Sequence, residues 1–313
     1  MTLSVVRYPD AAADAPLPGM VGTHPLMREV YRLVRKAAPT ELPVAIVGET
    51  GVGKELVARA LHDLSLRRCG PFVTVNAAAV PESLFESELF GHERGAFSDA
   101  RVAKPGLLEI AHRGTFFCDE IATLPPHCQA KLLRVVEEGV SRRVGGIEGH
   151  PAAPRWIVTC QEYDHAKSIA KGLREDLWYR LSSVIVHLPP LRDRRSDIPA
   201  LITLFLTARA FDPARVEPRA LAKLIDAAWP GNVREVKQVL GRLALGADGS
   251  SITATAVDRA LERPEDPSRR HARAALLQVL EAENWNVRRA ARSLGIAPGT
   301  LYRRLRAAGL QRI

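Results

Sequence analysis

The chain has 313 residues, of which 46% are hydrophobic and 25% charged, and its formal net charge is +9 at pH 7. A chain of this length exceeds what one hydrophobic core usually supports, so two or three domains are expected. No stretch approaches the about 18 consecutive apolar residues of a membrane span, and acidic residues stand where a signal peptide would be apolar, which predicts a cytoplasmic protein.

A Pro- and Ala-rich lead over residues 1–19 is expected to be disordered, and a helical pattern follows from near His24. Strand-like and helix-like segments then alternate as far as residue 190. This alternation predicts an α/β fold, a sheet with crossover helices, over residues 20–190. The expected strands are 44–47, 72–76, 114–118, 156–159 and 184–187.

A glycine-rich loop lies between the first expected strand and a helical run that begins at Leu56. Glycines let the backbone N–H groups of such a loop wrap phosphates, the helix N-terminus adds positive potential, and Lys54 reaches the terminal phosphates. Glu55 takes the place of the Ser or Thr whose hydroxyl usually meets magnesium. The sequence therefore predicts a nucleotide-binding P-loop made of Gly48, Glu49, Thr50, Gly51, Val52, Gly53, Lys54 and Glu55.

Two carboxylates follow the strand expected at 114–118. Asp119 and Glu120 come directly after the apolar run Phe116, Phe117 and Cys118. Asp119 is expected to hold the shell of a nucleotide-bound Mg²⁺, and Glu120 to polarise the attacking water. The alternative, a solvated strand edge, suits so apolar a run less well.

From Ile198 the strand pattern ends, and amphipathic helices run through Leu206, 221–227 and 233–245. They predict a helical lid over residues 191–262. Two prolines then mark a linker over residues 263–269.

The positive charge lies at the C-terminal end. Residues 269–313 hold ten arginines, no lysine, and only Glu281 and Glu283 as acids, a net charge of +8 that leaves +1 for the other 268 residues. A basic segment with a strong apolar pattern is typical of a nucleic-acid-binding module, so double-stranded DNA is the expected partner.

Residues 270–313 predict a helix-turn-helix domain, with helices over 274–283, 287–294 and about 299–308. Asn286 is expected to cap the second helix and Gly295 to end it. The expected core is Ala290, Ile296, Leu301 and Leu305. Arginines of the second helix are expected near backbone phosphates, and residues of the third near base edges or adjacent phosphates. The residues expected near phosphates are Arg288, Arg289 and Arg292. Those expected near base edges or adjacent phosphates are Thr300, Arg303 and Arg304.

The cysteines, Cys69, Cys118, Cys128 and Cys160, are widely spaced and form no CxxC pair. Buried, reduced thiols are therefore expected rather than a disulfide framework or a zinc site. The nine histidines show no ligand spacing such as HExxH, so any metal is expected to come with the nucleotide.

Residues 86–100, ESELFGHERGAFSDA, form a polar and aromatic loop that an ordinary nucleotide-binding core does not require. The loop closely resembles the GAFTGA loop of bacterial sigma-54-dependent activators, with Ser98 and Asp99 where that family has Thr and Gly. The run NVRRAARSLGIAPGTLYRRLRAAGL resembles the Fis-type module that ends many of these activators. The resemblance extends from Val21 to Leu310, with the motifs in the family's order.

The resemblance implies an AAA+ ATPase that uses ATP and Mg²⁺, binds an upstream activator site, assembles a homo-oligomeric ring and remodels the closed complex of the sigma-54 RNA polymerase holoenzyme. The implied sigma-54 contact consists of Gly95, Ala96, Phe97, Ser98, Asp99 and Ala100. Members of the family commonly have Glu at the position of Glu55, which supports ATP binding here.

Further roles are implied by the same motifs. Asn76 matches the residue that restrains the catalytic glutamate until the partner engages. Arg174 and Arg180 match a pair of arginine fingers that reach the neighbouring subunit's γ-phosphate. Arg234, in WPGNVREV, matches the second sensor on the lid.

Two departures from the family pattern leave alternatives open. Cys160 and Gln161 stand where members commonly have Thr and Asn; Gln161 is expected to contact the γ-phosphate, and Cys160 is a weak donor. Asp99 puts a carboxylate close to Phe97, in the part of the loop that is implied to contact sigma-54. The alternative function is therefore a DNA-binding regulator that keeps the ATPase core without remodelling sigma-54 polymerase, and a third is an AAA+ remodeller of another protein. A paralogue in the ring and a separate regulatory protein are further expected partners.

Overall fold

The computed structural model describes residues 14–161, 163–164, 169–247, 249–262, 267–283 and 285–307. The chain divides into two units, residues 1–257 and 258–313. The first contains a parallel sheet with its covering helices and most of a helical subdomain, and the second contains the C-terminal helices.

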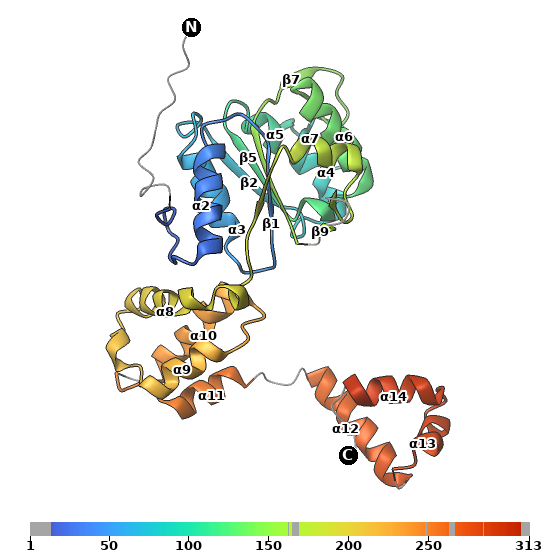
Figure 1. Cartoon of the computed structure of the whole chain (residues 1–313). Helices are drawn as coiled ribbons and strands as arrows, with labels where there is room; N and C mark the ends of the chain where they lie inside the picture. The colour runs from blue at the N-terminus through green and yellow to red at the C-terminus, as the bar shows by residue number, and fades with distance from the viewer. Residues whose placement is uncertain are drawn as a thin grey trace. The chain divides into compact units, whose positions relative to one another are not determined.

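The described residues of the first unit form a five-stranded parallel sheet in the order β11-β1-β8-β5-β2 (Figure 1). The strands are β1 (Val44–Val47), β2 (Phe72–Asn76), β5 (Thr115–Asp119), β8 (Arg155–Cys160) and β11 (Val184–His187). β1 is buried along its whole length, as expected for a strand of a parallel sheet with both faces covered. All the strands predicted from the sequence are confirmed, and β5 and β8 each end one residue later than expected.

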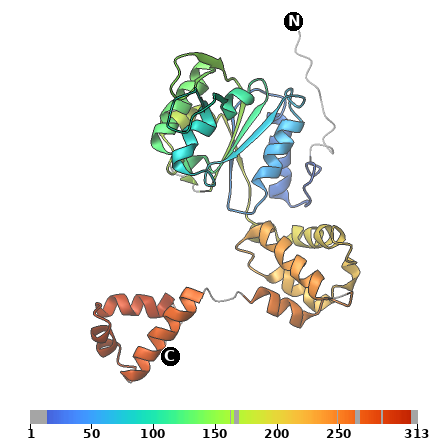
Figure 2. The ribbon, with the colours of Figure 1, turned by 180° about the vertical axis from the view of Figure 1, so that it is seen from behind.

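Helices cover both faces of this sheet (Figures 1 and 2). One face carries α2 (Pro25–Ala37) and α3 (Lys54–Asp63), in a cluster with Ile46. The other carries α4 (Glu82–Phe90), α5 (Leu107–Ile110), α6 (Pro126–Glu138) and α7 (Glu175–Leu181), around Ala45. Neighbouring strand residues such as Ala45 and Ile46 point to opposite faces and so belong to different clusters.

The end of the N-terminal lead contributes to the core. Residues 1–13 lie outside the described part of the chain, but Leu17 is 1% exposed and belongs to the same cluster as Met27 of α2. Arg35 Nη1 donates to the Ala15 carbonyl at 2.8 Å. The expectation of a disordered lead is therefore wrong for residues 14–19, because an apolar side chain there is buried beside α2.

Short hairpins interrupt the alternation of strands and helices and were not predicted. β3 (Gly91–His92) pairs with β4 (Lys104–Pro105), β6 (Val140–Arg142) with β7 (Gly149–Pro151), and β9 (Tyr163–Asp164) with β10 (Ile169–Ala170). Strands of two or three residues are too short to show an alternating pattern.

The lid consists of α8 (Ile198–Thr207), α9 (Pro218–Asp226), α10 (Asn232–Gly246) and α11 (Ala254–Leu261). The first three confirm the predicted lid helices. α8 packs on α10, and Leu206 and Leu240 are fully buried. Prolines in the first turns of α8 and α9 cost nothing there, since those N–H groups have no partner within the helix.

In the described part of the second unit, α12 (Pro267–Ala282), α13 (Val287–Ser293) and α14 (Pro298–Ala307) surround a small core of Leu280, Ala290, Ala291, Leu301 and Leu305. The predicted core residues are confirmed, and Ile296 packs against the cluster.

The predicted helix ends of this unit are also confirmed. Asn286 caps α13 by accepting from the Arg289 N–H at 3.1 Å, and Gly295, with φ 63°, follows its end. Of the linker expected over residues 263–269, residues 263–266 lie outside the described part, and α12 already begins at Pro267. Residues 267–269 of the expected linker are therefore helical, because proline fits the first turn of a helix.

The cysteines are free thiols: Cys118, Cys128 and Cys160 are buried, as predicted, whereas Cys69 is exposed. The expectation was wrong for Cys69 because this residue lies in the loop after α3. No helix among the described residues is long and apolar enough to cross a membrane.

Candidate nucleotide-binding site

The glycine-rich loop connects β1 to α3. Gly51 (φ 80°) and Gly53 (φ 110°) adopt the left-handed backbone that favours glycine. Lys54, the first residue of α3, is 7% exposed, and its Nζ donates to the Gly48 carbonyl at 2.8 Å. The ammonium group therefore lies over its own loop, at a helix N-terminus whose free N–H groups favour an anion.

Asp119 and Glu120 stand at the C-terminal end of β5, as predicted. Glu120 Oε1 lies 3.4 Å from Lys54 Nζ. Thr159, which is fully buried in β8, donates to Asp119 Oδ1 at 2.5 Å and accepts from the Glu120 N–H at 2.9 Å. One hydroxyl thus holds the carboxylate of Asp119 and the backbone of Glu120 beside the P-loop lysine.

Asn76 contacts Asp119 and not Glu120. β2 and β5 pair in a register that sets Asn76 beside Asp119, and Asn76 Nδ2 donates to Asp119 Oδ2 at 3.3 Å. The carboxylate of Glu120 is contacted instead by Gln161, whose Nε2 donates to Oε1 at 2.7 Å. The strand register thus places Asn76 next to this pair of carboxylates, and its expected role in restraining Glu120 stays a prediction.

Cys160 is a core residue. Its side chain is fully buried, and burial raises the pKa of its thiol to about 11. Its carbonyl accepts from the Gly48 N–H at 3.3 Å, so it contributes to the site through its backbone.

A turn of the lid, residues 229–234, contacts the P-loop directly. Asn232 is fully buried, with φ 53°, and its Nδ2 donates to the Thr50 carbonyl at 3.0 Å. The Arg234 N–H donates to the Gly51 carbonyl at 3.2 Å, while the Arg234 side chain is exposed. The segment predicted to carry the second sensor is therefore in contact with the loop predicted to hold the phosphates.

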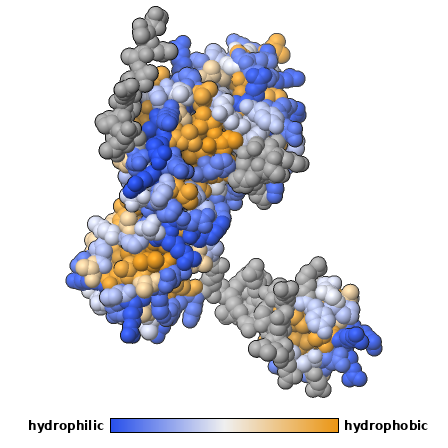
Figure 3. Space-filling model, viewed as in Figure 1, coloured by the Kyte–Doolittle hydropathy of each residue, from blue (hydrophilic) through white to orange (hydrophobic). Residues whose placement is uncertain are grey.

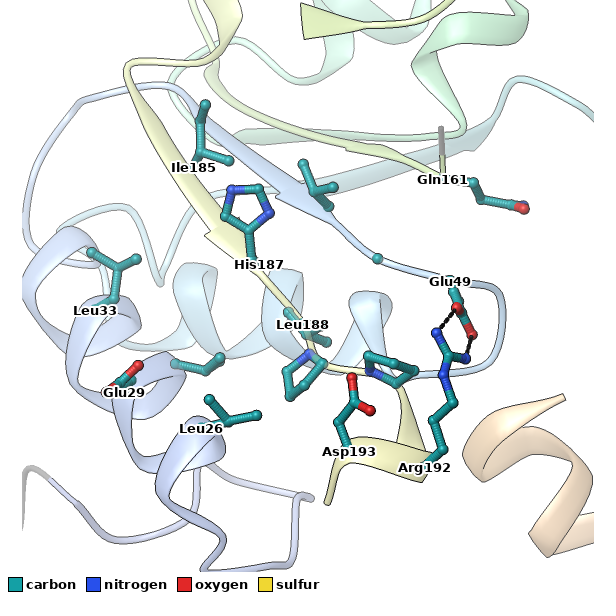
Figure 4. A pocket seen from close by; sticks show the side chains of 15 residues that line it. Leu26, Glu29, Leu33, Glu49, Gln161, Ile185, His187, Leu188, Arg192 and Asp193 are labelled. Carbon is teal, nitrogen blue, oxygen red and sulfur yellow. Dashed lines mark hydrogen bonds and ion pairs between the residues drawn. The ribbon is translucent and has the colours of Figure 1, made fainter. Parts of the chain in front are cut away.

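Glu49 joins the P-loop to the start of the lid. Its two carboxylate oxygens accept from Arg192 at 2.8 and 3.0 Å (Figure 4). Oε2 also accepts from Asn232 Nδ2 at 3.1 Å. Hydrogen bonds from Arg192 lower the pKa of the Glu49 carboxyl.

A pocket of about 600 Å³ lies beside the P-loop, bounded by α2, β11 and the segment that follows β11 (Figure 4). Figure 3 shows apolar side chains gathered beside α2 on this side of the unit. Leu26, Leu33 and Ile185 form part of the wall, and Gly48 and Gln161 line the end nearest the phosphate loop.

Two buried charges lie beneath the P-loop. Arg194 Nη2 donates to the Val52 carbonyl at 2.9 Å, and Asp197 Oδ1 accepts from the N–H groups of Thr23 and His24 at 2.9 and 3.0 Å. Burial lowers the pKa of the Arg194 guanidinium, against the opposing charge of Asp197. These contacts fasten the first residues of the lid to the P-loop and to the segment before α2.

Arg174 and Arg180 lie at the N-cap and in the last turn of α7, across the sheet from α3. Arg174 pairs with Asp176 at 2.7 Å and Arg180 with Glu137 at 3.1 Å, and the arginine side chains are 49% and 61% exposed. The two predicted arginine fingers therefore face outward from the side of the unit opposite the P-loop helix.

The Phe97 loop, residues 95–100, extends between β3 and β4. Phe97 is 42% exposed, and its ring centroid lies 4.9 Å from that of His92. Ser98 and Asp99 are exposed. The loop therefore presents an aromatic group and a carboxylate together.

The hairpin of β6 and β7 supports the Phe97 loop. Arg143 donates to Glu109 at 2.7 Å and to Glu93 at 3.1 Å. A Cβ on Gly145 would lie only 2.8 Å from Ala96 Cβ, so the two loops are in close contact.

The second unit presents basic side chains on α13. Arg288, Arg289 and Arg292 are exposed, and Figure 3 shows a hydrophilic surface over this helix. Thr300 is half-buried on α14. Arg303 and Arg304 also lie on α14, at positions whose side chains are outside the described part of the structure.

Residues that order the site were missed from the sequence. The strand pattern predicts Thr159 only as a strand residue, and the motifs assign no role to Asn232 or Arg192. A polar residue near the end of an otherwise apolar strand is a signal that could have found Thr159.

A parallel sheet with a P-loop after β1, paired carboxylates after β5 and a helical lid against the P-loop defines an AAA+ nucleotide-binding protein. Residues 20–187 match the sigma-54 interaction domain, residues 192–274 the AAA+ ATPase lid domain, and residues 273–307 the Fis family of bacterial regulatory proteins. The chain belongs to the sigma-54 interaction domain family, which confirms the resemblance.

Several full-length relatives are similar over nearly the whole chain. The DNA-binding transcriptional regulator NtrC of Rhizobium meliloti (strain 1021) is 42% identical over 310 residues, which are 96% of this chain and 64% of that protein. The C4-dicarboxylate transport transcriptional regulatory protein DctD of the same organism is 39% identical, over 99% of this chain and 68% of its own length. The chain thus spans less than two thirds of this NtrC and about half of other relatives, such as 52% of NtrC of Bradyrhizobium sp. (strain RP501 Parasponia), which is 46% identical over 78% of this chain.

Solved structures agree with the fold. NtrX from Brucella abortus in complex with ATP superposes with a TM-score of 0.70 at 34% identity, over 96% of this chain and 71% of that one. A RuvB mutant from Thermotoga maritima shares the fold at a TM-score of 0.54 and 16% identity, over 93% of this chain and 90% of that one.

Proposed function

We propose that this chain is a sigma-54-dependent activator: an ATPase that binds upstream DNA and uses ATP hydrolysis to remodel the closed complex of the sigma-54 RNA polymerase holoenzyme. One observation carries the proposal. Glu120 Oε1 lies 3.4 Å from the P-loop Lys54 Nζ in a chain of the sigma-54 interaction domain family. A carboxylate beside a phosphate-binding lysine suits phosphoryl transfer to water and has no use in DNA binding alone.

ATP and Mg²⁺ are the proposed cofactors, and the residues present fit them. Magnesium prefers oxygen ligands and uses one or two carboxylates together with phosphates. Asp119 offers such a carboxylate, which Thr159 holds at 2.5 Å through one oxygen. Bound Mg²⁺ would neutralise charge on the phosphates, Lys54 would hold the terminal phosphates, and Glu120 would orient the attacking water.

A homo-oligomeric ring is the proposed assembly, and the position of the arginines on α7 supports it. Arg174 and Arg180 are exposed and lie across the sheet from α3. Arginines so placed suit a neighbour's nucleotide better than their own, and they would neutralise charge that develops on its γ-phosphate. Arg234 would contact the nucleotide from the lid.

The Phe97 loop is the proposed sigma-54 contact. An aromatic side chain that is 42% exposed at the end of a hairpin can bury its apolar surface against a protein partner. Support from the β6–β7 hairpin would transmit movement between the ATPase core and this loop.

The second unit is the proposed DNA contact. The exposed arginines of α13 would meet backbone phosphates, and Thr300, Arg303 and Arg304 on α14 would lie toward base edges in the major groove.

An in vitro transcription assay tests the proposal directly. Purified full chain, sigma-54 holoenzyme and ATP would be combined on a sigma-54 promoter that carries an upstream site, with Glu120→Gln as the inactive control. We expect open complexes with the wild-type chain and their loss with Glu120→Gln. ATP turnover and specific DNA binding without open complexes would instead support the regulator that does not remodel polymerase, for which the exposed carboxylate of Asp99 is the structural ground.

A further inference from the structure

Gln129 is a buried polar residue in the first turn of α6, a helix that packs against α7 (Figure 1). Its side chain is 3% exposed. Its Nε2 donates to the carbonyls of Leu124 and Gly172 at 2.8 and 3.1 Å, and its Oε1 accepts from the Arg174 N–H at 2.9 Å. Because a carbonyl only accepts and an N–H only donates, these three partners fix the orientation of the amide.

The three partners of Gln129 belong to two segments with different roles in the proposed reaction. Leu124 directly follows the short helix Ile121–Thr123, whose last N–H donates to the Glu120 carbonyl at 2.9 Å. The other two partners lie in the segment before α7, which carries Arg174 at the N-cap of that helix. One buried amide therefore joins the turn after the proposed catalytic carboxylate to an arginine that is proposed to act on a neighbouring subunit.

The two segments are also in close contact with each other. Gly172 has φ 86°, and a Cβ on it would lie 3.1 Å from the Ala122 carbonyl oxygen. Leu173 is buried and shares a core cluster with Ile121. The backbone before α7 is thus packed against the turn after the carboxylate, and the amide of Gln129 fastens the two together.

Arg174 combines a fixed backbone with an exposed side chain. Its N–H is bound by Gln129, and its carbonyl accepts from the Trp178 N–H at 3.0 Å. Its guanidinium is exposed and pairs with Asp176. Stabilisation of charge on a transferring phosphoryl group depends on the exact place of the cation, and the backbone sets where that side chain starts.

We propose that Gln129 is a positioning residue for ATP hydrolysis in the neighbouring subunit: it sets the place of Arg174, and thereby of the guanidinium that would reach the neighbour's γ-phosphate. The inference rests on the proposed function, in which the chain hydrolyses ATP as a ring. It assigns to a buried amide a role that its own subunit's nucleotide does not require.

The substitution Gln129→Met keeps an unbranched side chain of similar length and removes all three hydrogen bonds. We expect kcat for ATP to fall by about a hundredfold, since a misplacement of about 1 Å can cost that much. KM should change little, because the arginine would act in the transition state while the chain's own P-loop binds ATP. Cys128→Ala, at a fully buried neighbour on the same helix, is the matched control and is expected to keep the wild-type kcat.

Rings assembled from two variants separate a role at the neighbour's site from a role at the chain's own site. Glu120→Gln chains lack the carboxylate but keep the arginines, and Arg174→Ala chains have the reverse, so a ring of both contains complete sites and should hydrolyse ATP. If Gln129 acts through Arg174, Gln129→Met regains about tenfold or more when it is assembled with Glu120→Gln, and nothing with Arg174→Ala. Restoration by Arg174→Ala instead would place its effect on its own subunit's carboxylate and overturn the proposal.

Failure of the positioning role can be told apart from failure of the proposed function. An unchanged kcat in Gln129→Met, or restoration by neither partner, overturns the positioning role alone, provided that wild-type hydrolysis is lost in Glu120→Gln. Absence of wild-type hydrolysis, or no restoration when Glu120→Gln and Arg174→Ala are mixed, overturns the ring site and the positioning role together. If circular dichroism shows that Gln129→Met does not fold, Gln129→Glu, which keeps the size and the acceptor for the Arg174 N–H, is assembled in the same mixtures, with the same pattern expected.

Discussion

Arg155 is a buried cation that completes the ends of two helices. Its guanidinium is 1% exposed and donates to the carbonyls of Ala37, Ala38 and Leu61 at 2.7, 2.6 and 3.3 Å. These carbonyls lie at the C-terminal ends of α2 and α3, where acceptors lack partners within the helix. The arginine thereby joins both helices to β8.

We expect Arg155→Leu to lower the free energy of unfolding by about 3 kcal/mol, because the buried carbonyls of Ala38 and Leu61 lose their donor and a leucine cannot replace it. Urea unfolding followed by circular dichroism measures the change. Arg142→Leu, at a side chain that is 53% exposed, is the control and should alter stability by about 0.5 kcal/mol or less. Equal effects of the two substitutions would contradict this role of Arg155.

We expect His62 to make the first unit sensitive to mild acid. The His62 side chain is 5% exposed, and its Nδ1 lies 2.9 Å from the buried Thr115 hydroxyl. Burial lowers the pKa of the imidazole. The charge of Asp63 opposes that shift, whereas the charges of Arg59 and Arg155 add to it. The folded pKa is below the unfolded value of about 6.5, so the unfolded chain binds the proton more tightly.

The contribution of His62 to stability is therefore complete above pH about 6.5 and is lost as the pH falls through the folded pKa. We expect the unfolding free energy to decrease from pH 7.5 to pH 5, and His62→Gln, which keeps a polar partner for Thr115, to flatten this dependence. Urea titrations at several pH values measure it. An identical slope in the variant would assign the acid sensitivity to other groups.

At the residue scale, the sequence predicted the chemistry of the site better than its contacts. Lys54, Asp119 and Glu120 follow from motif and strand pattern, and they do come together. The contact of Asn76 with Asp119 depends on the register of β2 with β5, which no local pattern specifies.

The Phe97 loop is the element whose chemistry departs from its family. Asp99 is exposed, and its φ is not positive, so a glycine is not required at this position by the backbone. Asp99 is therefore expected to weaken a contact with sigma-54 through its charge, because the carboxylate must lose its hydrating water when an apolar partner covers the loop.

We expect Asp99→Asn and Asp99→Gly to raise open-complex formation by up to about tenfold, the equivalent of 1.4 kcal/mol, with Asn giving most of the gain. Single-round transcription at fixed ATP measures the effect. Phe97→Ala is the control with the opposite expected result: it should abolish open-complex formation. A gain with Gly alone would show that backbone freedom matters more than charge.

Elements were predictable where their patterns are long. The strands of the sheet and the helices of the lid have enough residues to show their periods. The hairpins β3–β4 and β6–β7, which carry and support the Phe97 loop, have two or three residues a strand, and they are held by tertiary contacts such as Arg143 with Glu109 at 2.7 Å.

At the scale of the whole molecule, the order of the motifs predicted the architecture of both units. The same order of motifs predicts that the arginines on α7 act on the nucleotide of another copy of the chain, and the proposed mechanism keeps this role. Nearly all of the net charge lies in the C-terminal segment: residues 269–313 carry +8 of the total +9.

This division predicts that DNA affinity depends on salt through the second unit. Arg288 and Arg289 are exposed on α13. Each phosphate that is neutralised contributes about −0.9 to the slope of log K against log salt. We expect the Arg288→Ala, Arg289→Ala double variant to make this slope shallower by about 2 and to weaken binding to specific and nonspecific duplexes alike, because phosphate contacts carry no sequence information.

Fluorescence anisotropy with labelled duplexes at several salt concentrations measures both quantities. Arg219→Ala, at an exposed arginine on α9 of the first unit, is the matched control and should leave the slope as it is. A loss confined to the specific site, with the slope preserved, would mean that these arginines read base edges. Phosphate contact would then fall to other arginines of the C-terminal segment, and the orientation of the helix-turn-helix on DNA would have to be reversed.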